Sequence, residues 1–233
     1  GTTFNGDGRF VVCDAHTMKR LVARDMPFYA NIDTSTGATQ SSKSTLCWPQ
    51  HIVVVSPEKA YIQYSTADNE SHSGIRIVDL QTNIIRTSDI PGTFGVFTKT
   101  GATKARMIFS RGKVFAGRGN SVIVLDPATD AVIKTVTYEN RQVKDLAKGY
   151  DGKIYAIFTG EFTGNSCMTG AASFTKPAMI VALDANGEVV SETNLPEQIE
   201  LRTGTASPTV QMCASFTQPH LYFIGKQDFS AYE

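Results

Sequence analysis

The chain has 233 residues and carries 22 basic and 22 acidic side chains, so its formal net charge is zero. That balance gives no support for nucleic acid or an anionic membrane surface as a partner, and its longest apolar run is far too short to span a bilayer. The length suits one sizeable domain, and we expect a single domain over residues 1–233, complete or incomplete.

The first part of the chain predicts strands separated by a long connection. Residues 10–14 (FVVCD) have the composition of a β-strand, and a partner strand precedes residue 24. Residues 24–50 form a polar connection that nevertheless contains Phe28, Tyr29 and Trp48. Residues 51–90 then hold four short apolar segments, with an insertion at 67–74 between the second and the third.

Residues 107–136 show the same pattern most clearly. The apolar segments MIF, KVFAG, SVIVLD and AVIKTV are separated by SRG, RGN and PATD. Such runs, bounded by Gly, Asn, Asp and Pro, predict strands joined by tight turns. The pattern returns from about residue 143, interrupted by residues 161–177, and a last connection over 194–211 leads to a final strand pair.

Two kinds of residue recur in register along these repeats. An aromatic lies in each second strand and an aspartate closes each third strand. We expect the aspartates to start turns by accepting hydrogen bonds from backbone amides two residues further on. The aromatics are Tyr61, Phe115, Tyr155 and Tyr222, and the aspartates are Asp14, Asp79, Asp126 and Asp184.

Repeats of roughly 40–50 residues, each a four-stranded unit, predict an all-β fold: a β-propeller of four-stranded antiparallel blades. About four blades' worth of repeats is present. Because the first strand corresponds to a third strand and the last to a second, two interpretations stay open. Either the two ends complete one blade and close a ring of four, or the chain is a fragment of a larger propeller, for example one of about seven blades.

The unequal lengths of the connections predict where a site lies. From aligned aromatic to aspartate there are 18, 11 and 29 residues, whereas the first-to-second and third-to-fourth turns are all short. Second-to-third loops and blade-to-blade connections emerge on one face of a propeller. We therefore expect residues 24–50, 67–74, 161–178 and 194–211 to bound a functional face.

The register also nominates residues on that face. Eleven residues before each aligned aromatic, at the start of a first strand, lie Gln50, Lys104, Lys144 and Gln211. All four can donate hydrogen bonds, which suits an anionic or carbonyl-bearing ligand, although a solvated channel mouth is polar in any case. The aromatic residues of the long connection either stack on a flat ligand or pack their own loop. The candidate ligand-binding set is therefore Trp48, Gln50, Phe28, Tyr29, Lys104, Lys144 and Gln211.

Other patterns give no site. The cysteines have no C-x-x-C spacing and the histidines have no metal-ligand spacing, so we expect no metal and no cofactor. We expect Cys13 to be a small core residue because it lies in a strand. No G-x-S-x-G motif is present, and no catalytic residue is assigned. The cysteines are Cys13, Cys47, Cys167 and Cys213.

Residues 56–87, 112–136 and 151–160 resemble the YVTN-type bacterial β-propellers, with a turn, an aromatic second strand and then V-x-V-I-D-x-x-T-x-x-V. More narrowly, the chain resembles the surface propeller lipoproteins of Bacteroidetes-type outer membranes. Some of those capture corrinoids such as vitamin B12 and pass them to a TonB-dependent transporter. Gln50 stands where that group has an arginine, so the resemblance implies no inherited ligand contact there.

The resemblance implies an exported protein, at the cell surface or in the periplasm, that is anchored to the outer membrane in its full-length form. Its implied partners are a corrinoid-like small molecule or an outer-membrane transporter. We therefore expect a non-enzymatic ligand-binding propeller. The alternatives are a propeller enzyme of the lyase, lactonase or quinoprotein type, and a protein-interaction scaffold. Because the aligned ring holds no carboxylate at its own positions, with Asp145 one residue away, binding is favoured over catalysis.

Overall fold

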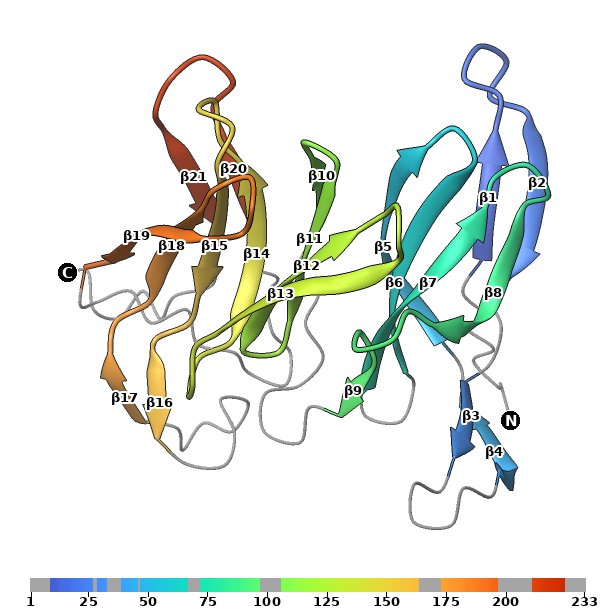
Figure 1. Ribbon diagram of the computed structural model, residues 1–233, viewed down its shortest axis with the longest axis horizontal. Coiled ribbons are helices and arrows are strands. Elements are labelled where there is room, and N and C mark those ends of the chain that lie inside the picture. The colour runs from blue at the N-terminus through green and yellow to red at the C-terminus, as the bar shows by residue number, and fades with distance from the viewer. Residues whose placement is uncertain are drawn as a thin grey trace. The chain divides into compact units, whose positions relative to one another are not determined.

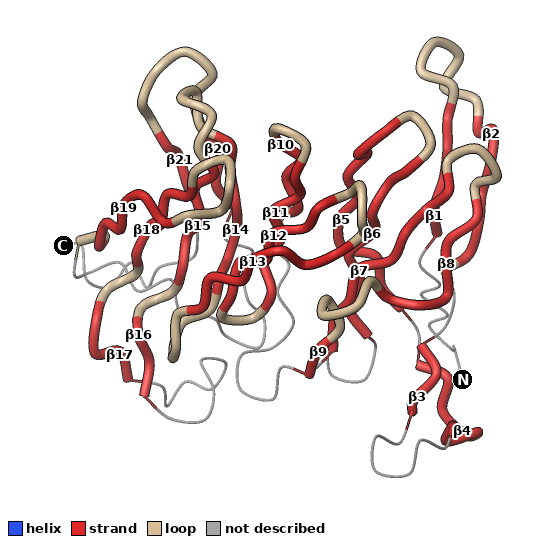
Figure 2. The backbone as a smooth tube through the Cα atoms, in the orientation of Figure 1, coloured by secondary structure: helices blue, strands red, loops and turns tan. Residues whose placement is uncertain are grey.

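The computed structural model describes residues 9–26, 29–32, 39–45, 47–66, 72–96, 106–163, 173–196 and 211–224, and the following account concerns these residues. They form strands and turns, without a helix in any of these ranges (Figure 2). Accordingly, a search of the same ranges finds no helix that could cross a membrane. The chain divides into two compact units, Gly1–Val96 and Phe97–Glu233, and each is described by itself.

The first unit contains one complete antiparallel meander and two strand pairs (Figure 1). The meander runs in the order β5-β6-β7-β8, and β9 pairs with β7 beside it. The strand pairs are β1-β2 and β3-β4, the second of which lies within the connection over residues 24–50. The strands are β1 (Arg9–Cys13), β2 (Arg20–Asp25), β3 (Tyr29–Ile32), β4 (Thr39–Thr45), β5 (Cys47–Ser56), β6 (Lys59–Thr66), β7 (His72–Asp79), β8 (Ile84–Asp89) and β9 (Gly95–Val96).

The second unit contains two complete four-stranded meanders, β10-β11-β12-β13 and β14-β15-β18-β19. The pair β20-β21 follows them, and the hairpin β16-β17 is inserted between the second and third strands of the second meander. The strands are β10 (Met107–Ser110), β11 (Lys113–Arg118), β12 (Ser121–Asp126), β13 (Ala131–Thr137), β14 (Val143–Lys148), β15 (Ile154–Phe158), β16 (Glu161–Thr163), β17 (Ser173–Lys176), β18 (Met179–Leu183), β19 (Val189–Asn194), β20 (Gln211–Ala214) and β21 (Leu221–Ile224).

The inner strands of each meander are buried on both faces, because sheets stack against neighbouring sheets within a unit. β11 and β12 are apolar at nearly every position, whereas the outer strand β13 alternates and the outer strand β19 is exposed along its whole length. The main core of the second unit joins β11 and β12 to β14, β15 and β18. A blade thus buries its middle strands only when a neighbour covers it, which is the logic of repeat architectures.

The expected register of the repeats is confirmed. The four aligned aromatics lie in β6, β11, β15 and β21, the second strand of each meander or strand pair. Each aligned aspartate accepts a hydrogen bond from the backbone N–H two residues on: His16 to Asp14 (2.9 Å), Gln81 to Asp79 (2.9 Å), Ala128 to Asp126 (2.9 Å) and Asn186 to Asp184 (2.8 Å). Hydrogen bonds from the backbone N–H groups of Thr17, Thr82 and Glu188, with smaller contributions from the bonds just given, lower the pKa of Asp14, Asp79 and Asp184 respectively.

The expectation of a buried Cys13 is wrong. Cys13 is exposed and is a free thiol. Burial alternates regularly along β1, so Phe10 and Val12 pack against the core of the first unit while Val11 and Cys13 lie on the exposed face. Successive side chains of a strand point to opposite faces, so membership of a strand does not by itself make a residue buried.

The fold class is confirmed as all-β with four-stranded antiparallel meanders, the blade unit of a β-propeller. Whether the blades close a ring of four or belong to a larger ring stays a prediction, as does the single domain over residues 1–233. Within the second unit, the first strands β10, β14 and β20 are neighbours, because β14 contacts the other two. Their starts therefore form one end of the unit, the entry end, and the tight turns after them form the opposite end.

Candidate functional site

Three of the seven residues predicted to bind a ligand have described side chains. Lys144 is the second residue of β14 and Gln211 is the first of β20, both at the entry end of the second unit. Gln50 lies in β5 of the first unit. The backbones of Trp48 and Tyr29 lie in β5 and β3, but their side chains fall outside the described part. Phe28 and Lys104 fall outside the described residues altogether.

Gln50 and Lys144, equivalent in the repeat, are both the additional residue of a β-bulge. In β5, Pro49 pairs with Tyr64 and His51 pairs with Gln63, so the ladder skips one position between them. In β14, Val143 pairs with Phe158 and Asp145 pairs with Ile157, with the same skip. Bulges re-aim side chains and are common beside functional sites. The structure therefore gives these two positions a shared local geometry that the sequence register alone did not predict.

The carboxylate of Asp145 is the centre of the entry end. Arg106, immediately before β10, donates from Nε to Oδ1 (3.1 Å), from Nη2 to Oδ2 (2.6 Å) and from its backbone N–H to Oδ1 (3.3 Å). The backbone N–H of Met212 in β20 donates to Oδ2 (2.7 Å), and that of Leu146 donates to Oδ1 (2.9 Å). One buried carboxylate thus ties the starts of three neighbouring first strands together.

Arg106 is held rigidly but remains accessible. Its Nη2 also donates to the backbone carbonyl of Met212. The side chain of Asp145 is only 4% exposed, whereas that of Arg106 is 41% exposed. Hydrogen bonding to Asp145 raises the pKa of the Arg106 guanidinium, so the group stays charged. Its Nη1 donates to no described residue, which leaves one end of an oriented guanidinium open.

Lys144 is anchored to the connection that precedes it. Its Nζ donates to Oε1 of the buried Gln142 at 2.8 Å. The backbone N–H of Gln142 donates to Thr159 Oγ1 (3.0 Å), and the backbone N–H of Thr159 donates to the Gln142 carbonyl (2.9 Å). The ammonium group of Lys144 is therefore presented from a segment that is bonded to the end of β15.

A second arginine, this one buried, fixes the base of the β16-β17 hairpin. Arg141 is 4% exposed, and its Nη1 donates to the carbonyls of Thr159 and Pro177, both at 2.8 Å. These carbonyls lie just before and just after the hairpin, so one guanidinium clamps both of its legs. Burial lowers the pKa of Arg141. On the hairpin itself, Lys176 pairs with Glu161 (2.8 Å), and a hydrogen bond from Lys176 is the main cause that lowers the pKa of Glu161.

The side chains described at the entry end can orient hydrogen-bond acceptors. Arg106, Lys144 and Gln211 supply donors, and the nearest carboxylate, Asp145, is occupied by five hydrogen bonds. Among the described residues, no group of three His, Cys, Asp or Glu side chains is placed to hold a metal ion. The arrangement resembles a recognition site for carbonyl or anionic oxygen atoms.

Reasoning from the sequence missed Arg106 and Arg141. The repeat register pointed to Lys104, two residues before Arg106, and mentioned Asp145 only as a neighbour of Lys144. One signal could have found them: both arginines directly precede a first strand, at the residue before β10 and two residues before β14. The spacing differs by one residue between the two strands.

Comparison with known proteins adds a family. A family model described as "Domain of unknown function (DUF5074)" matches residues 3–232. The curated protein sequences contain no significant match to the chain.

Several solved structures are similar to this chain. One is the β-propeller domain of Myceliophteria thermophila Cps50 (Swd1), with 9% identity and a TM-score of 0.49 over 94% of this chain and 60% of that chain. Another is Kluyveromyces lactis Hsv2p, with 15% identity and a TM-score of 0.44 over 94% and 66%. A protein of unknown function from Bacteroides caccae has 14% identity and a TM-score of 0.37 over 62% and 43%. The chain thus spans between 43% and 66% of the length of these three structures.

Proposed function

We propose that this chain, which belongs to the DUF5074 family, is a non-enzymatic binding protein that holds a small molecule at the entry end of its first strands. The observation that carries the proposal is the state of Arg106. Asp145 fixes its guanidinium from one side, while Nη1 donates to no described residue and the side chain is 41% exposed. An oriented, accessible donor loses little conformational entropy when it binds an acceptor.

The chemistry of this end favours a ligand that bears carbonyl or carboxylate oxygens. Arg106 supplies a fixed donor, and the bulged Lys144, whose Nζ donates to Gln142 Oε1, supplies an ammonium group from the neighbouring first strand β14. Charge-assisted hydrogen bonds to such oxygens are the strong ones in proteins. Gln211 at the start of β20 adds an exposed amide, and Lys104 belongs to the same predicted set.

A corrinoid is the ligand class we propose first, because its periphery carries many amide carbonyls and the repeats resemble propellers that capture such molecules. In this proposal the chain acts at the cell surface or in the periplasm, anchored to the outer membrane in its full-length form, and passes its ligand to an outer-membrane transporter. Trp48, Phe28 and Tyr29 belong to the proposal as stacking residues, and Gln50 as the equivalent of Lys144 in the first unit.

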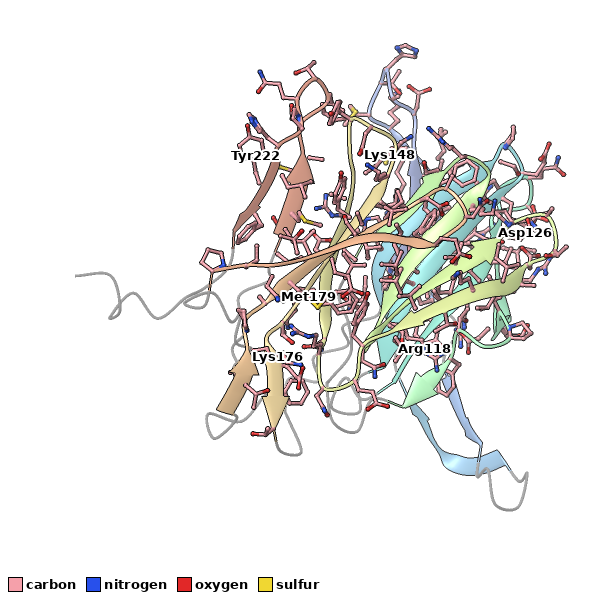
Figure 3. All side chains as sticks on the ribbon, turned by 60° about the vertical axis from the view of Figure 1, so that its left-hand side comes forward. Arg118, Asp126, Lys148, Lys176, Met179 and Tyr222 are labelled. Carbon is pink, nitrogen blue, oxygen red and sulfur yellow. The ribbon has the colours of Figure 1, made fainter. Side chains whose placement is uncertain are left out.

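The test compares two lysines of one strand. Lys144 lies at the entry end of β14 and Lys148 at its other end, where it is exposed (Figure 3). Binding of cyanocobalamin, haem and an acidic oligosaccharide would be measured by titration calorimetry with the unmodified protein, Lys144→Ala and Lys148→Ala. We expect Lys144→Ala to raise the dissociation constant of the compound that binds about tenfold, because one charge-assisted hydrogen bond is lost. Lys148→Ala should leave this dissociation constant unchanged.

Two results would contradict the proposal. One is an equal loss in both variants, which would place the ligand elsewhere or indicate non-specific attraction to positive charge. The other is turnover of a bound compound, detected by mass spectrometry of the recovered ligand, which would restore the enzyme alternative.

A further inference from the structure

The turn end of the second unit, opposite the proposed ligand site, gathers the cations that the unit leaves unpaired. Most lysines and arginines described in this unit have a hydrogen-bond or ion-pair partner, such as Asp145 for Arg106, Glu188 for Lys134 and Glu161 for Lys176. Three have neither among the described residues: Arg111, Lys113 and Lys148. All three lie beside the turns that join first to second strands, at β10-β11 and β14-β15.

Three exposed aromatic side chains lie at the same end. Phe109 is 38% exposed at the end of β10, and Tyr150 is 52% exposed in the β14-β15 turn. Phe216 is 95% exposed in the β20-β21 turn. We call these three aromatics and the three cations the turn-end patch. Aromatic and arginine side chains are enriched at protein interfaces, and exposed aromatics next to unpaired charge are typical of a binding surface.

The turns that carry the patch are adjacent and rigid. A Cβ atom placed on Gly152 would lie 2.7 Å from Nη2 of Arg111, so the guanidinium of the first turn rests on the backbone of the second. Arg111 and Gly112 both have positive φ values, 50° and 77°, which define a tight two-residue hairpin turn. The β20-β21 pair packs on the same side of the second meander, because Ala214 and Phe223 pack against the apolar cluster that contains Ala147 and Ile157.

The patch is positive rather than balanced. Among the three first-to-second turns, only the β14-β15 turn holds a carboxylate, Asp151, which accepts hydrogen bonds from Lys153 Nζ (2.7 Å) and Tyr155 Oη (3.0 Å). The Asp151–Lys153 pair is neutral, so within these turns the charges of Arg111, Lys113 and Lys148 have no described carboxylate partner. Figure 3 shows Lys148 and Lys176 at opposite ends of their blade, with the unpaired lysine at the turn end.

We propose that the turn-end patch docks an acidic segment of a protein partner, whose carboxylates contact Arg111, Lys113 and Lys148 and whose apolar side chains pack on Phe109, Tyr150 and Phe216. A protein is favoured over an anionic membrane because two of the three aromatics are held partly within the fold. Only Phe216 could insert into lipid, and membrane association needs a larger inserted apolar area together with the basic charge. The chain thus has two binding ends, one for a small molecule and one for a protein.

The test uses a fluorescent peptide of alternating glutamate and leucine with a single tryptophan, and a matched peptide in which glutamine replaces each glutamate. Fluorescence anisotropy measures the affinity of each for the full chain. We expect the acidic peptide to bind and the glutamine peptide to bind at least about tenfold more weakly, because charge complementarity supplies the attraction. The double variant Arg111→Glu and Lys148→Glu should lower the affinity for the acidic peptide about tenfold. Phe216→Ala should lower it about fivefold.

Arg86→Glu, an exposed charge reversal on β8 of the first unit, is the matched control and should leave the affinity unchanged. Lys144→Ala should also leave it unchanged, which separates this surface from the proposed ligand site. Equal binding of the two peptides, or an equal loss in the Arg86→Glu protein, would overturn the proposal. A third result would also overturn it: the protein binds vesicles of mixed neutral and anionic phospholipid, the double variant does not, and neither peptide binds. The patch would then be a membrane contact.

Discussion

Each unit buries an aspartate beside an arginine, but the two pairs are constructed differently. In the second unit Asp145 receives hydrogen bonds from Arg106 and from backbone N–H groups on two strands. In the first unit Asp89 accepts a hydrogen bond from Tyr64 Oη at 2.8 Å, and Arg76 Nε lies 3.6 Å from its Oδ1. Arg76 is 1% exposed and its guanidinium lies over the Tyr64 ring at 4.5 Å.

The difference shows which partner is buried and what the pair is for. In the first unit the arginine is buried. Arg76 of β7 and Asp89 of β8 pack beside Tyr64 of β6, so the role of this pair is structural. In the second unit the carboxylate is enclosed while the arginine reaches solvent, so the pair both links three strands and presents a donor. Burial raises the pKa of Asp89, because few hydrogen bonds compensate for lost hydration. The same residue types therefore serve packing in one place and present an accessible donor, which we propose takes part in ligand binding, in the other.

The largest effect should follow from removal of the Asp145 carboxylate. Asp145→Ala leaves the N–H groups of Met212 and Leu146 without their acceptor and Arg106 without its counter-ion. Breaking a buried pair in this way typically lowers the free energy of unfolding by about 3–5 kcal/mol, and we expect about 3 kcal/mol because Arg106 can be hydrated. Chemical denaturation measures the change. Glu139→Ala, an exposed carboxylate in the same unit, should change stability by less than about 0.5 kcal/mol.

An intermediate effect is expected where the first unit packs its pair most closely. A Cβ atom at Gly74 would lie 2.5 Å from Asp89 Oδ1 and 2.8 Å from Tyr64 Oη. Gly74→Ala should therefore displace both side chains and lower the free energy of unfolding by about 1–3 kcal/mol, as overpacking does. Thr87→Ala on the exposed side of β8 is the control. An unfolding midpoint equal to that of the unmodified protein would show that the Arg76–Asp89 pair is loosely packed. That result would contradict the structural role given to this pair in the comparison with Arg106 and Asp145.

The smallest effect should be a pH dependence confined to the first unit. Because the folded-state pKa of Asp89 is raised above its usual value of 3.8, the folded state holds the proton more tightly than the unfolded state. The stabilisation from this proton is fully present below about pH 3.8 and is lost as pH rises through the folded pKa. Asp89→Asn should remove this component from a series of unfolding curves at different pH. A stability profile that is unchanged in shape by the substitution would contradict the raised pKa.

Much of the fold could be predicted from the sequence because it depends on local chemistry. Turn residues and alternating apolar segments predicted the positions of the second strands and of their aromatic residues. Each aligned aspartate starts a turn, as its position predicted. These features need only a few neighbouring residues. Cys13 was placed wrongly because its exposure depends on which face of β1 packs against the core, and that face carries Phe10 and Val12.

The candidate site was predicted only in part. The repeat identified Lys144 and Gln211 by their position at the start of first strands, and their strands are neighbours in the structure. It missed Arg106 and gave Asp145 no role, because what matters there is a set of hydrogen bonds between residues that lie far apart in the chain.

The sequence by itself thus determined the strands, the turns and the repeat, since these follow from backbone preferences and periodicity over a few residues. Only the tertiary structure decided which charges are paired and which are left open. Arg106 and Lys148 are both basic residues at the ends of first strands, and no local pattern distinguishes them. Arg106 contacts a buried carboxylate supplied by the next blade, whereas Lys148 is exposed to solvent.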